Sequence, residues 1–421
     1  MSTEARIPPT KSLPAGLPRN VWAVSLTSFF MDISSEMVLN VLPLFLANVL
    51  GTRMAVIGLI EGVAEATASV LKLFSGWLSD RLHARKWLAV AGYGLSTITK
   101  PFFYFANSWG MVAGVRWVDR VGKGIRTAPR DALVADSVSE KQRGRAFGFQ
   151  RAADTAGAML GLLIALGVVW LAQSNTLTLD ETTFRTLVLI SLVPAVLAVL
   201  VLAIGARDMP ISGQGPLPRF ALRALGRPFL VFMVIVALFD LGNSSDAFLV
   251  LRAQERGMSV VGILSMLVVF SLVYTLVSAP AGMLSDRIGR RQLIIGGWLL
   301  YAIIYLGFGL AETSRQVWFL YAIYGLYYGL AYGTSKAMIA DLVTENVRGT
   351  AYGTYNAVLG ILDLPASLIA GILWQGVGGW DGFGAAAPFL FGAILSFAAA
   401  LLMATWMPRE MKKSVQSFQP N

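Results

Sequence analysis

The sequence GWLSDRLHARK occupies residues 76–86, between two long apolar stretches, and a close variant, GMLSDRIGRR, returns at residues 282–291. Each copy ends one apolar stretch and begins the next. The two copies share Gly, Leu, Ser, Asp and Arg in the same order, followed by further basic residues. A basic loop between two membrane helices needs positive charge, but it does not need this order of residues. Two copies at matching places therefore indicate an internal duplication.

The composition excludes most classes of soluble protein. Of the 421 residues, 56% are hydrophobic and 14% are charged, and the mean hydropathy is positive, as expected of a chain built for lipid. The chain has no cysteine, so nothing in it points to a disulfide, a zinc finger or a thiol nucleophile.

The formal net charge of +10 could suggest nucleic-acid binding, but the placement of the charge argues against it. Roughly 20 of the Lys and Arg residues lie in alternate connections and at the two ends, against about 5 in the other connections. This positive-inside pattern predicts a multi-pass membrane protein with both termini in the cytoplasm and with no nucleic-acid partner.

Twelve segments are long and apolar enough to cross a bilayer, which requires about 20 apolar residues per helix. They lie near residues 21–48, 55–79, 87–107, 110–135, 145–172, 184–205, 229–252, 259–284, 292–312, 316–341, 350–377 and 384–407. The connection after the sixth segment is long and rich in Pro, Gly and Arg, so it reads as a linker. The predicted organisation is a disordered cytoplasmic arm rather than a signal peptide (1–20), a six-helix bundle (21–205), a cytoplasmic linker (206–228), a second six-helix bundle (229–407) and a cytoplasmic tail (408–421).

A second pair of stretches supports the duplication. Ala135 and Asp136, followed by RGRAFG at residues 143–148, are echoed by Ala340 and Asp341, followed by RGTAYG at residues 348–353. The separation of about 205 residues agrees with that of the opening motif.

The doubled G-x-L-S-D-R loop resembles the loop signature of the major facilitator superfamily of secondary transporters, and the resemblance covers nearly the whole chain. It implies an all-α integral membrane fold of 12 transmembrane helices in two pseudo-symmetric six-helix bundles, with a site between parallel repeats near the bilayer midplane. In that family the loop is thought to hold the cytoplasmic side closed. The resemblance therefore implies a conformational latch formed by Gly76, Asp80, Arg81, Gly282, Asp286 and Arg287.

The predicted fourth segment carries an unusual number of charges. Arg116, Arg120, Lys123 and Arg130 share one face of a helix, and Asp119, Arg126 and Asp131 lie beside them. The run RVGKGI at residues 120–125 resembles the fourth-helix signature of antiporters of the superfamily, which implies that Arg120 takes part in proton coupling. Lys123 and Arg126 stand where uncharged residues are usual. This departure disfavours a general drug pump, because a cationic cavity repels cations; the alternative is that nearby carboxylates neutralise these cations.

Carboxylates on the first two segments are candidates for proton transfer. Asp32, Glu36 and Asn40 are spaced four residues apart, and Asn40 begins a sequence (NVLP) that resembles the end of the family's first-helix motif. Glu61 and Glu65 repeat the arrangement on the second segment. A carboxylate held between burial and a nearby cation can change protonation as a cavity opens to either side. Fixed ion pairs that orient helices remain the structural alternative.

The second half offers fewer cations and more aromatic residues. Tyr321, Tyr324, Tyr328 and Tyr332 follow helical spacing ahead of Lys336, a stripe that serves either packing or a cavity wall. Asp240, Asn243, Asp246, Asn356 and Asp363 complete the polar side chains of this half. The predicted substrate cavity comprises Asn40, Arg116, Lys123, Arg126, Arg130, Asp240, Asn243, Tyr328, Tyr332, Lys336 and Asn356.

These features predict a proton-coupled secondary active transporter, monomeric and located in the cytoplasmic (inner) membrane of a bacterium. Its arginines favour a small polar, anionic solute such as an organic acid or a metal chelate, moved by alternating access. Proton-driven efflux of lipophilic drugs is the alternative, and a non-transporting receptor stays open. An ion channel gives no reason for the duplicated loop. No phosphate-binding loop, nucleophile elbow or metal-ligand cluster is recognisable, so we predict no enzymatic activity, no cofactor and no metal site.

Overall fold

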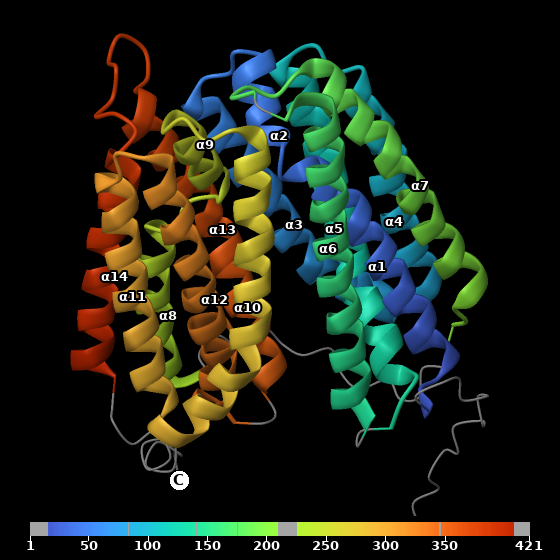
Figure 1. The fold of residues 1–421 in the computed structure, drawn as a ribbon. Helices are drawn as coiled ribbons and strands as arrows, with labels where there is room; N and C mark the ends of the chain where they lie inside the picture. The colour runs from blue at the N-terminus through green and yellow to red at the C-terminus, as the bar shows by residue number, and fades with distance from the viewer. Residues whose placement is uncertain are drawn as a thin grey trace, which may run out of the picture. The chain divides into compact units, whose positions relative to one another are not determined.

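The structure is a computed structural model, and it describes residues 16–82, 84–139, 142–174, 176–208, 225–344 and 347–407. Within these ranges the regular structure is helical, apart from isolated bridges such as the one between Val377 and Trp380 (Figure 1). The helices are α1 (Arg19–Leu39), α2 (Leu42–Leu44), the π-helix η2 (Phe45–Val49), α3 (Met54–Leu82), α4 (Arg85–Tyr104), α5 (Trp109–Asp136), α6 (Arg143–Gln173), α7 (Glu181–Gly205), α8 (Gly226–Leu241), α9 (Ala247–Glu255), α10 (Val260–Ile288), α11 (Arg290–Leu310), α12 (Ser314–Leu342), α13 (Arg348–Gln375) and α14 (Ala387–Trp406).

The described part of the chain contains 8 helical segments that are long and apolar enough to cross a membrane. Helix α5 is not among them, because its charged residues lower its hydropathy, and α8 and α9 are each too short. The chain is therefore a multi-pass membrane protein of helical class. A helix occupies each of the twelve segments predicted above, and twelve spans remain a prediction.

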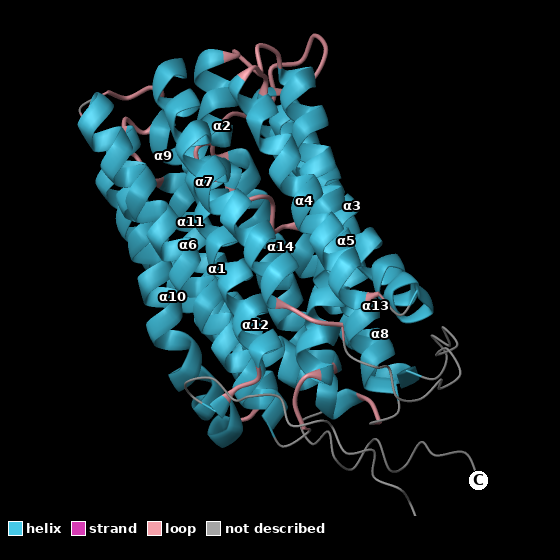
Figure 2. Ribbon diagram, turned by 90° about the vertical axis from the view of Figure 1, so that its right-hand side faces the viewer, coloured by secondary structure: helices cyan, strands magenta, loops and turns pink. Residues whose placement is uncertain are grey.

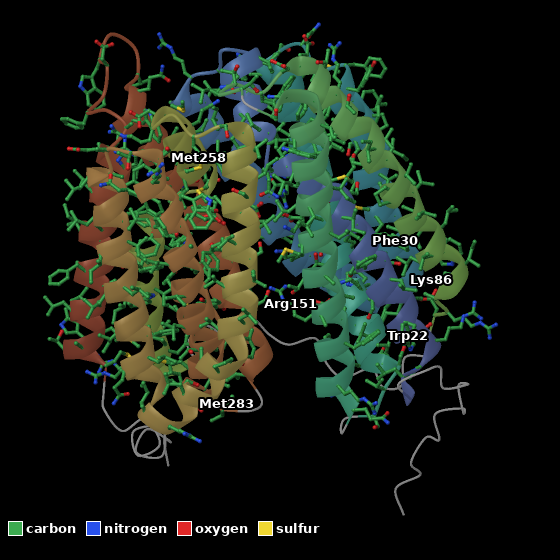
Figure 3. All side chains as sticks on the ribbon, in the orientation of Figure 1. Trp22, Phe30, Lys86, Arg151, Met258 and Met283 are labelled. Carbon is green, nitrogen blue, oxygen red and sulfur yellow. The ribbon has the colours of Figure 1, made fainter. Side chains whose placement is uncertain are left out.

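The chain divides into two compact units, and the first comprises residues 1–41, 67–168 and 181–217. Within it α1 packs along α7, and α4 packs along both α5 and α7. Helices α4 and α5 approach closely through glycines, since a Cβ atom on Gly92 would lie 2.7 Å from the Gly122 carbonyl oxygen. At the core edge the rings of Trp22 and Phe149 meet at 4.6 Å between centroids (Trp22 is labelled in Figure 3).

The second unit comprises residues 42–66, 169–180 and 218–421. Helix α11 packs along α12 and α14, and α10 packs along α12 (Figures 1 and 2). The unit includes the first part of α3, although that segment belongs to the predicted first bundle. The bundle boundaries given by the sequence stay a prediction.

Glycines bring α3 and α13 into backbone contact within this second unit. A Cβ atom on Gly58 would lie 2.2 Å from the Ser367 carbonyl oxygen, and one on Gly371 would lie 2.5 Å from the Met54 carbonyl oxygen. Hydrogen bonds join neighbouring segments of the same unit: Asn48 Nδ2 donates to Gln254 Oε1 at 3.0 Å, and Gln254 Nε2 donates to the Leu177 carbonyl at 2.7 Å. These contacts hold residues 42–66 and 169–180 against the rest of the second unit.

The duplication seen in the sequence returns as a repeated contact. Arg85, at the start of α4, forms an ion pair with Asp136 and donates to the Ala132 carbonyl at 3.2 Å. Arg290, at the start of α11, forms an ion pair with Asp341 at 2.6 Å and donates to the Ala337 carbonyl. All three partners of the second set lie 205 positions after those of the first. Each unit therefore closes the same helix pair with the same side chains.

Two of the predicted spans are interrupted rather than continuous. The segment predicted at 229–252 is divided by residues 242–246, which separate α8 from α9. The segment predicted at 21–48 changes at residues 40–41 from α1 into α2 and η2. The change at residues 40–41 has a local cause: Pro43 lacks the N–H group that would bond to the Leu39 carbonyl, and its ring would clash with that carbonyl. The first interruption coincides with the small polar run GNSSD, whose side chains compete for backbone hydrogen bonds.

Arginines complete the C-terminal ends of three helices. Arg252 donates to the carbonyls of Phe308 and Gly309, both at 3.0 Å, and of Ala311 at 3.2 Å, at the end of α11. Arg19 and Arg291 make similar bonds at the ends of α7 and α14. A helix C-terminus leaves carbonyls without intrahelical partners and carries partial negative charge, so a guanidinium satisfies both needs. These arginines hold the fold together.

Candidate functional site

In the first unit, α5 buries a group of charged side chains. Arg116, Asp119, Arg120 and Arg126 are each at most 8% exposed. Arg116 Nη1 lies 3.9 Å from Asp119 Oδ2, and Arg126 Nη1 donates to Ser96 Oγ at 2.6 Å. The Arg126 guanidinium also stacks over the Tyr93 ring, 4.4 Å from its centroid. Arg116 and Arg120, which the helical spacing placed on one face, and Arg126 beside that face are thus buried near Asp119.

Lys100 of α4 extends this buried group and was not predicted as a site residue. It is 3% exposed, and its Nζ donates to Ser34 Oγ and, at 3.2 Å, to Ser35 Oγ of α1. It interacts electrostatically with Asp119, as the three arginines do. The signal in the sequence is a lone lysine inside an apolar span, directly before Pro101.

The other predicted residues of the first unit differ in their surroundings. Arg130 forms an ion pair with Asp131 at 2.8 Å and donates to Ser28 Oγ at 3.4 Å, so the ion-pair alternative holds for Arg130. Glu36 accepts a hydrogen bond from Asn40 Nδ2 at 2.6 Å. Asp32 and Lys123 are half-buried on α1 and α5.

The second unit contains a polar cavity of about 430 Å³ beside the interruption between α8 and α9. Its lining consists of Glu61, Glu65, Asn243, Ser244, Ser245, Asp246, Tyr328, Asp363 and Ser367. The predicted proton-transfer candidates Glu61 and Glu65 thus lie in one cavity with the predicted Asn243 and Tyr328. Glu61 is 7% exposed, and Ser367 Oγ accepts from the Ser245 backbone N–H at 3.2 Å.

A second cavity of about 190 Å³ adjoins the first and shares Asn243, Tyr328 and Asp363 with it. It is otherwise lined by Val236, Phe239, Asp240, Trp298, Tyr327, Ala331, Ser335, Tyr355 and Leu359. Aromatic rings form much of this wall, and Phe239 stacks on Trp298 at 4.8 Å between centroids.

The tyrosine stripe of α12 serves both packing and a cavity wall. Tyr321 and Tyr324 are buried in an aromatic cluster with Phe270 and Phe308. The Tyr324 hydroxyl also donates to Asp246 Oδ1 at 3.3 Å, and Tyr328 lines both cavities. The side chain of the predicted Tyr332 lies outside the described residues.

The remaining predicted residues line neither cavity. Lys336 is half-buried on α12, and Asn356 is exposed on α13. Of the predicted latch, Gly76, Asp80 and Arg81 lie in the last turns of α3, and Gly282 and Asp286 lie in the last turns of α10. Their side chains lie outside the described residues, whereas Arg287 is exposed. The latch stays a prediction.

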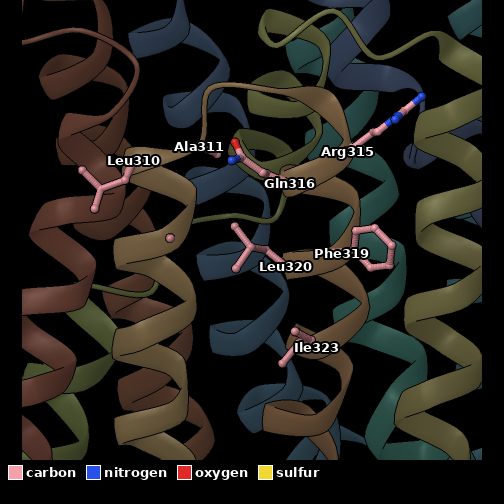
Figure 4. A pocket seen from close by; sticks show the side chains of 8 residues that line it. Leu310, Ala311, Arg315, Gln316, Phe319, Leu320 and Ile323 are labelled. Carbon is pink, nitrogen blue, oxygen red and sulfur yellow. The ribbon is translucent and has the colours of Figure 1, made fainter.

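A third hollow, of about 580 Å³, lies between α11 and α12 (Figure 4). Its walls include Leu310, Phe319, Leu320 and Ile323, with Arg315 and Gln316 near one end. Phe319 is 63% exposed and Leu310 66% exposed, as expected of side chains that face lipid. We therefore assign this groove to the lipid-facing surface rather than to a polar solute.

Comparison with known proteins reveals relatives over nearly the full length. The chain is 34% identical over 394 residues to an uncharacterised MFS-type transporter of Methanocaldococcus jannaschii, covering 92% of this chain and 94% of the relative. Among solved structures, a POT family transporter in complex with 5-aminolevulinic acid is similar with a TM-score of 0.75 at 13% identity, covering 95% of this chain and 98% of that one. A D-xylose–proton symporter is similar with a TM-score of 0.73 at 15% identity, covering 94% and 98%.

The two solved structures establish likeness of fold alone, and the sequence match establishes kinship. The family model of the Major Facilitator Superfamily matches residues 24–259 and 230–417, which together span almost the whole chain. This match confirms the family and the helical membrane fold that the doubled loop indicated, and members of the family are transporters rather than enzymes. The chain belongs to the Major Facilitator Superfamily (MFS).

Proposed function

We propose that this MFS transporter is a proton-coupled secondary active transporter that moves a small polar solute with an anionic group by alternating access. The observation that carries the proposal is the buried cationic group of the first unit. Lys100, Arg116, Arg120 and Arg126 are buried and interact electrostatically with Asp119, and Asp32 and Glu36 also interact with Lys100. Burying each charge costs roughly several kcal/mol of desolvation free energy. Charged side chains inside a membrane protein therefore mark places where a charged solute or ion binds or moves.

Proton coupling is supported by the carboxylates of the second unit. Glu61 and Glu65 face a cavity that also holds Asp246 and Asp363. Several carboxylates around one cavity repel one another when all are ionised, so they favour binding of protons. A transporter can then exchange these protons with either side of the membrane.

Alternating access is supported by the glycine contacts between α3 and α13. Backbone approaches of this kind are typical of helix pairs that pack tightly in membranes. They bring α3 and α13 together at residues 54–58 and 367–371. We propose that this contact opens and closes during transport. We also propose that both termini are cytoplasmic, and that the protein is a monomer in the cytoplasmic membrane of a bacterium.

Drug efflux is the less favoured function. A buried cationic group repels the lipophilic cations that many drug pumps export.

The test is flux into proteoliposomes under an imposed pH gradient, with a panel of labelled organic acids and a panel of lipophilic cations. We expect flux of at least one anion. Glu61→Gln or Glu65→Gln should reduce its pH-driven flux about ten-fold or more while counterflow exchange survives, because exchange needs no net proton movement. Glu312→Gln, an exposed carboxylate between α11 and α12, is the matched control.

Two results would contradict the proposal. One is wild-type pH dependence in all four variants Asp32→Asn, Glu36→Gln, Glu61→Gln and Glu65→Gln, which would remove proton coupling by these groups. The other is flux of lipophilic cations alone, which would favour drug efflux.

A further inference from the structure

The interruption of the seventh predicted span places polar side chains at the wall of a cavity. Residues 242–246 separate α8 from α9, and Asn243 and Asp246 face the larger cavity together with two serines between them. Non-helical backbone at membrane depth is tolerated where it lines a cavity, and such breaks are typical of ligand and ion sites in transporters.

Both cavities beside this break are acidic. Their described lining includes Glu61, Glu65, Asp240, Asp246 and Asp363, and it includes no Lys, Arg or His. Asp240 is 5% exposed and lines the smaller cavity. Its Oδ2 atom is buried without a hydrogen-bond partner among the described residues. An unsatisfied buried carboxylate oxygen costs roughly 1–3 kcal/mol or more, so this atom calls for a donor from a ligand.

The walls of the smaller cavity are suited to a cation. Phe239, Trp298, Tyr327, Tyr328 and Tyr355 place aromatic rings around Asp240 and Asp363. An aromatic face attracts a cation within about 6 Å, and Trp and Tyr are the strongest of these faces. Rings together with carboxylates are the combination that recognises organic ammonium groups.

The spacing of the carboxylates distinguishes an organic cation from a metal ion. In the described residues no three Asp, Glu, His or Cys side chains lie close enough together to hold a metal ion. The carboxylates are instead distributed around adjoining cavities of about 430 and 190 Å³. An organic cation, which carries further atoms beside its charged group, fits carboxylates that are distributed in this way.

We propose that the two adjoining cavities beside residues 242–246 bind an organic ammonium group. Asp240 and Asp363 accept hydrogen bonds from its N–H groups, and the group contacts the rings of Trp298 and Tyr355. The inference rests on the proposed function in that the ammonium group belongs to the transported solute, which then carries both an anionic and a cationic group. Binding itself is independent of transport and is tested without it.

The experiment is isothermal titration of the full chain in lipid nanodiscs at neutral pH with phenethylammonium, and with phenethyl alcohol as the neutral probe of similar shape. We expect saturable binding of the amine and at least about ten-fold weaker binding of the alcohol, as for loss of a charge-assisted hydrogen bond. Asp240→Asn and Asp363→Asn should each weaken amine binding by a similar factor. Asp381→Asn, an exposed carboxylate between α13 and α14, should bind as the wild type does.

Having two variants on different helices protects the test against a folding defect in either, and the elution volume of each variant shows whether it is folded. Equal binding of amine and alcohol would overturn the proposal, and so would wild-type affinity in both Asp240→Asn and Asp363→Asn. If the protein does not bind the amine but carries out pH-driven anion flux, the ammonium site is wrong and the proposed function still holds. If the protein binds the amine but transports nothing, the proposed function is wrong and the site still holds.

Discussion

Among the described residues outside α5, Arg252 and Lys100 are the most deeply buried cations, and their hydrogen-bond partners differ. Arg252 is fully buried, and its carbonyl partners complete the end of α11, so its bonds stabilise the fold. Lys100 is buried nearly as deeply, but its hydrogen-bond partners are the hydroxyls of Ser34 and Ser35. Arg252 also pairs with the Glu255 carboxylate at 2.6 Å, and neutral hydroxyls offset less of the desolvation cost than such a carboxylate does. We therefore place Lys100 with the functional group and Arg252 with the structural one.

Replacing Lys100 by an apolar side chain of similar length separates these roles. Lys100→Met should leave the midpoint of thermal unfolding unchanged or raise it by a few degrees, roughly, because a desolvated charge disappears. It should also reduce solute flux about ten-fold or more. Flux in proteoliposomes and thermal unfolding in the same lipid check both expectations, with Lys86→Met in the first turn of α4 as the control. A much lower midpoint with normal flux would make Lys100 a structural residue.

At the scale of elements, the repeated contact between a helix start and its neighbour shows how the duplication is preserved. Arg85 and Arg290 begin α4 and α11, and each reaches one aspartate and one carbonyl on the following helix. The arginine and aspartate side chains are 12% and 29% exposed in the first pair, and 25% and 35% in the second. Partly exposed pairs of this kind contribute about 1 kcal/mol or less.

The two copies should therefore respond alike to the same change. We expect Arg85→Gln and Arg290→Gln each to lower the free energy of unfolding by about 1 kcal/mol, and the double variant to lower it by the sum, because the contacts belong to separate units. Thermal or denaturant unfolding of the single and double variants measures this. A loss several times larger in one copy would show that the shared geometry hides different roles.

The sequence predicts this repeat well, because its residues stand in short motifs whose spacing is visible without a structure. It also predicts that Arg116 and Arg120 share one face of α5, because their spacing is helical, and both are buried. The break at residues 242–246 escaped prediction, since an apolar average over about 20 residues conceals five small or polar ones. Lys100 escaped because a single charge has no periodicity. Both cavities needed the structure, because they join side chains from residues 61 to 367.

At the scale of the whole molecule, the contact between α3 and α13 determines which segments belong together. Residues 42–66 come early in the chain, yet they pack with the second unit through Gly58, Gly62 and Gly371. Under the proposed alternating access, transport releases this contact and forms it again, and we expect the glycines to serve closure rather than permanent packing.

Side chains placed at these glycines should keep the contact open. Gly58→Leu and Gly371→Leu should each reduce flux about ten-fold or more, because backbone atoms occupy the space of a new Cβ. Gly296→Leu is the control, since nothing lies within 4 Å of a Cβ there. The chain has no native cysteine, so Ser367→Cys supplies a single thiol whose labelling by an impermeant maleimide reports opening. Normal flux and an unlabelled thiol in the Gly58 variant would contradict this role of the contact.

The charges of α5 also bear on how the protein enters the membrane during synthesis. Each of its buried cations would cost roughly 2.5–3.5 kcal/mol if the helix were handed to lipid alone by the translocon. Yet α5 fits α4 closely at Gly92 and Gly122, and Ser96 accepts from Arg126. We therefore expect α4, which is synthesised first, to stay at the translocon until α5 joins it. The two helices then leave as a hairpin with the charges already inside.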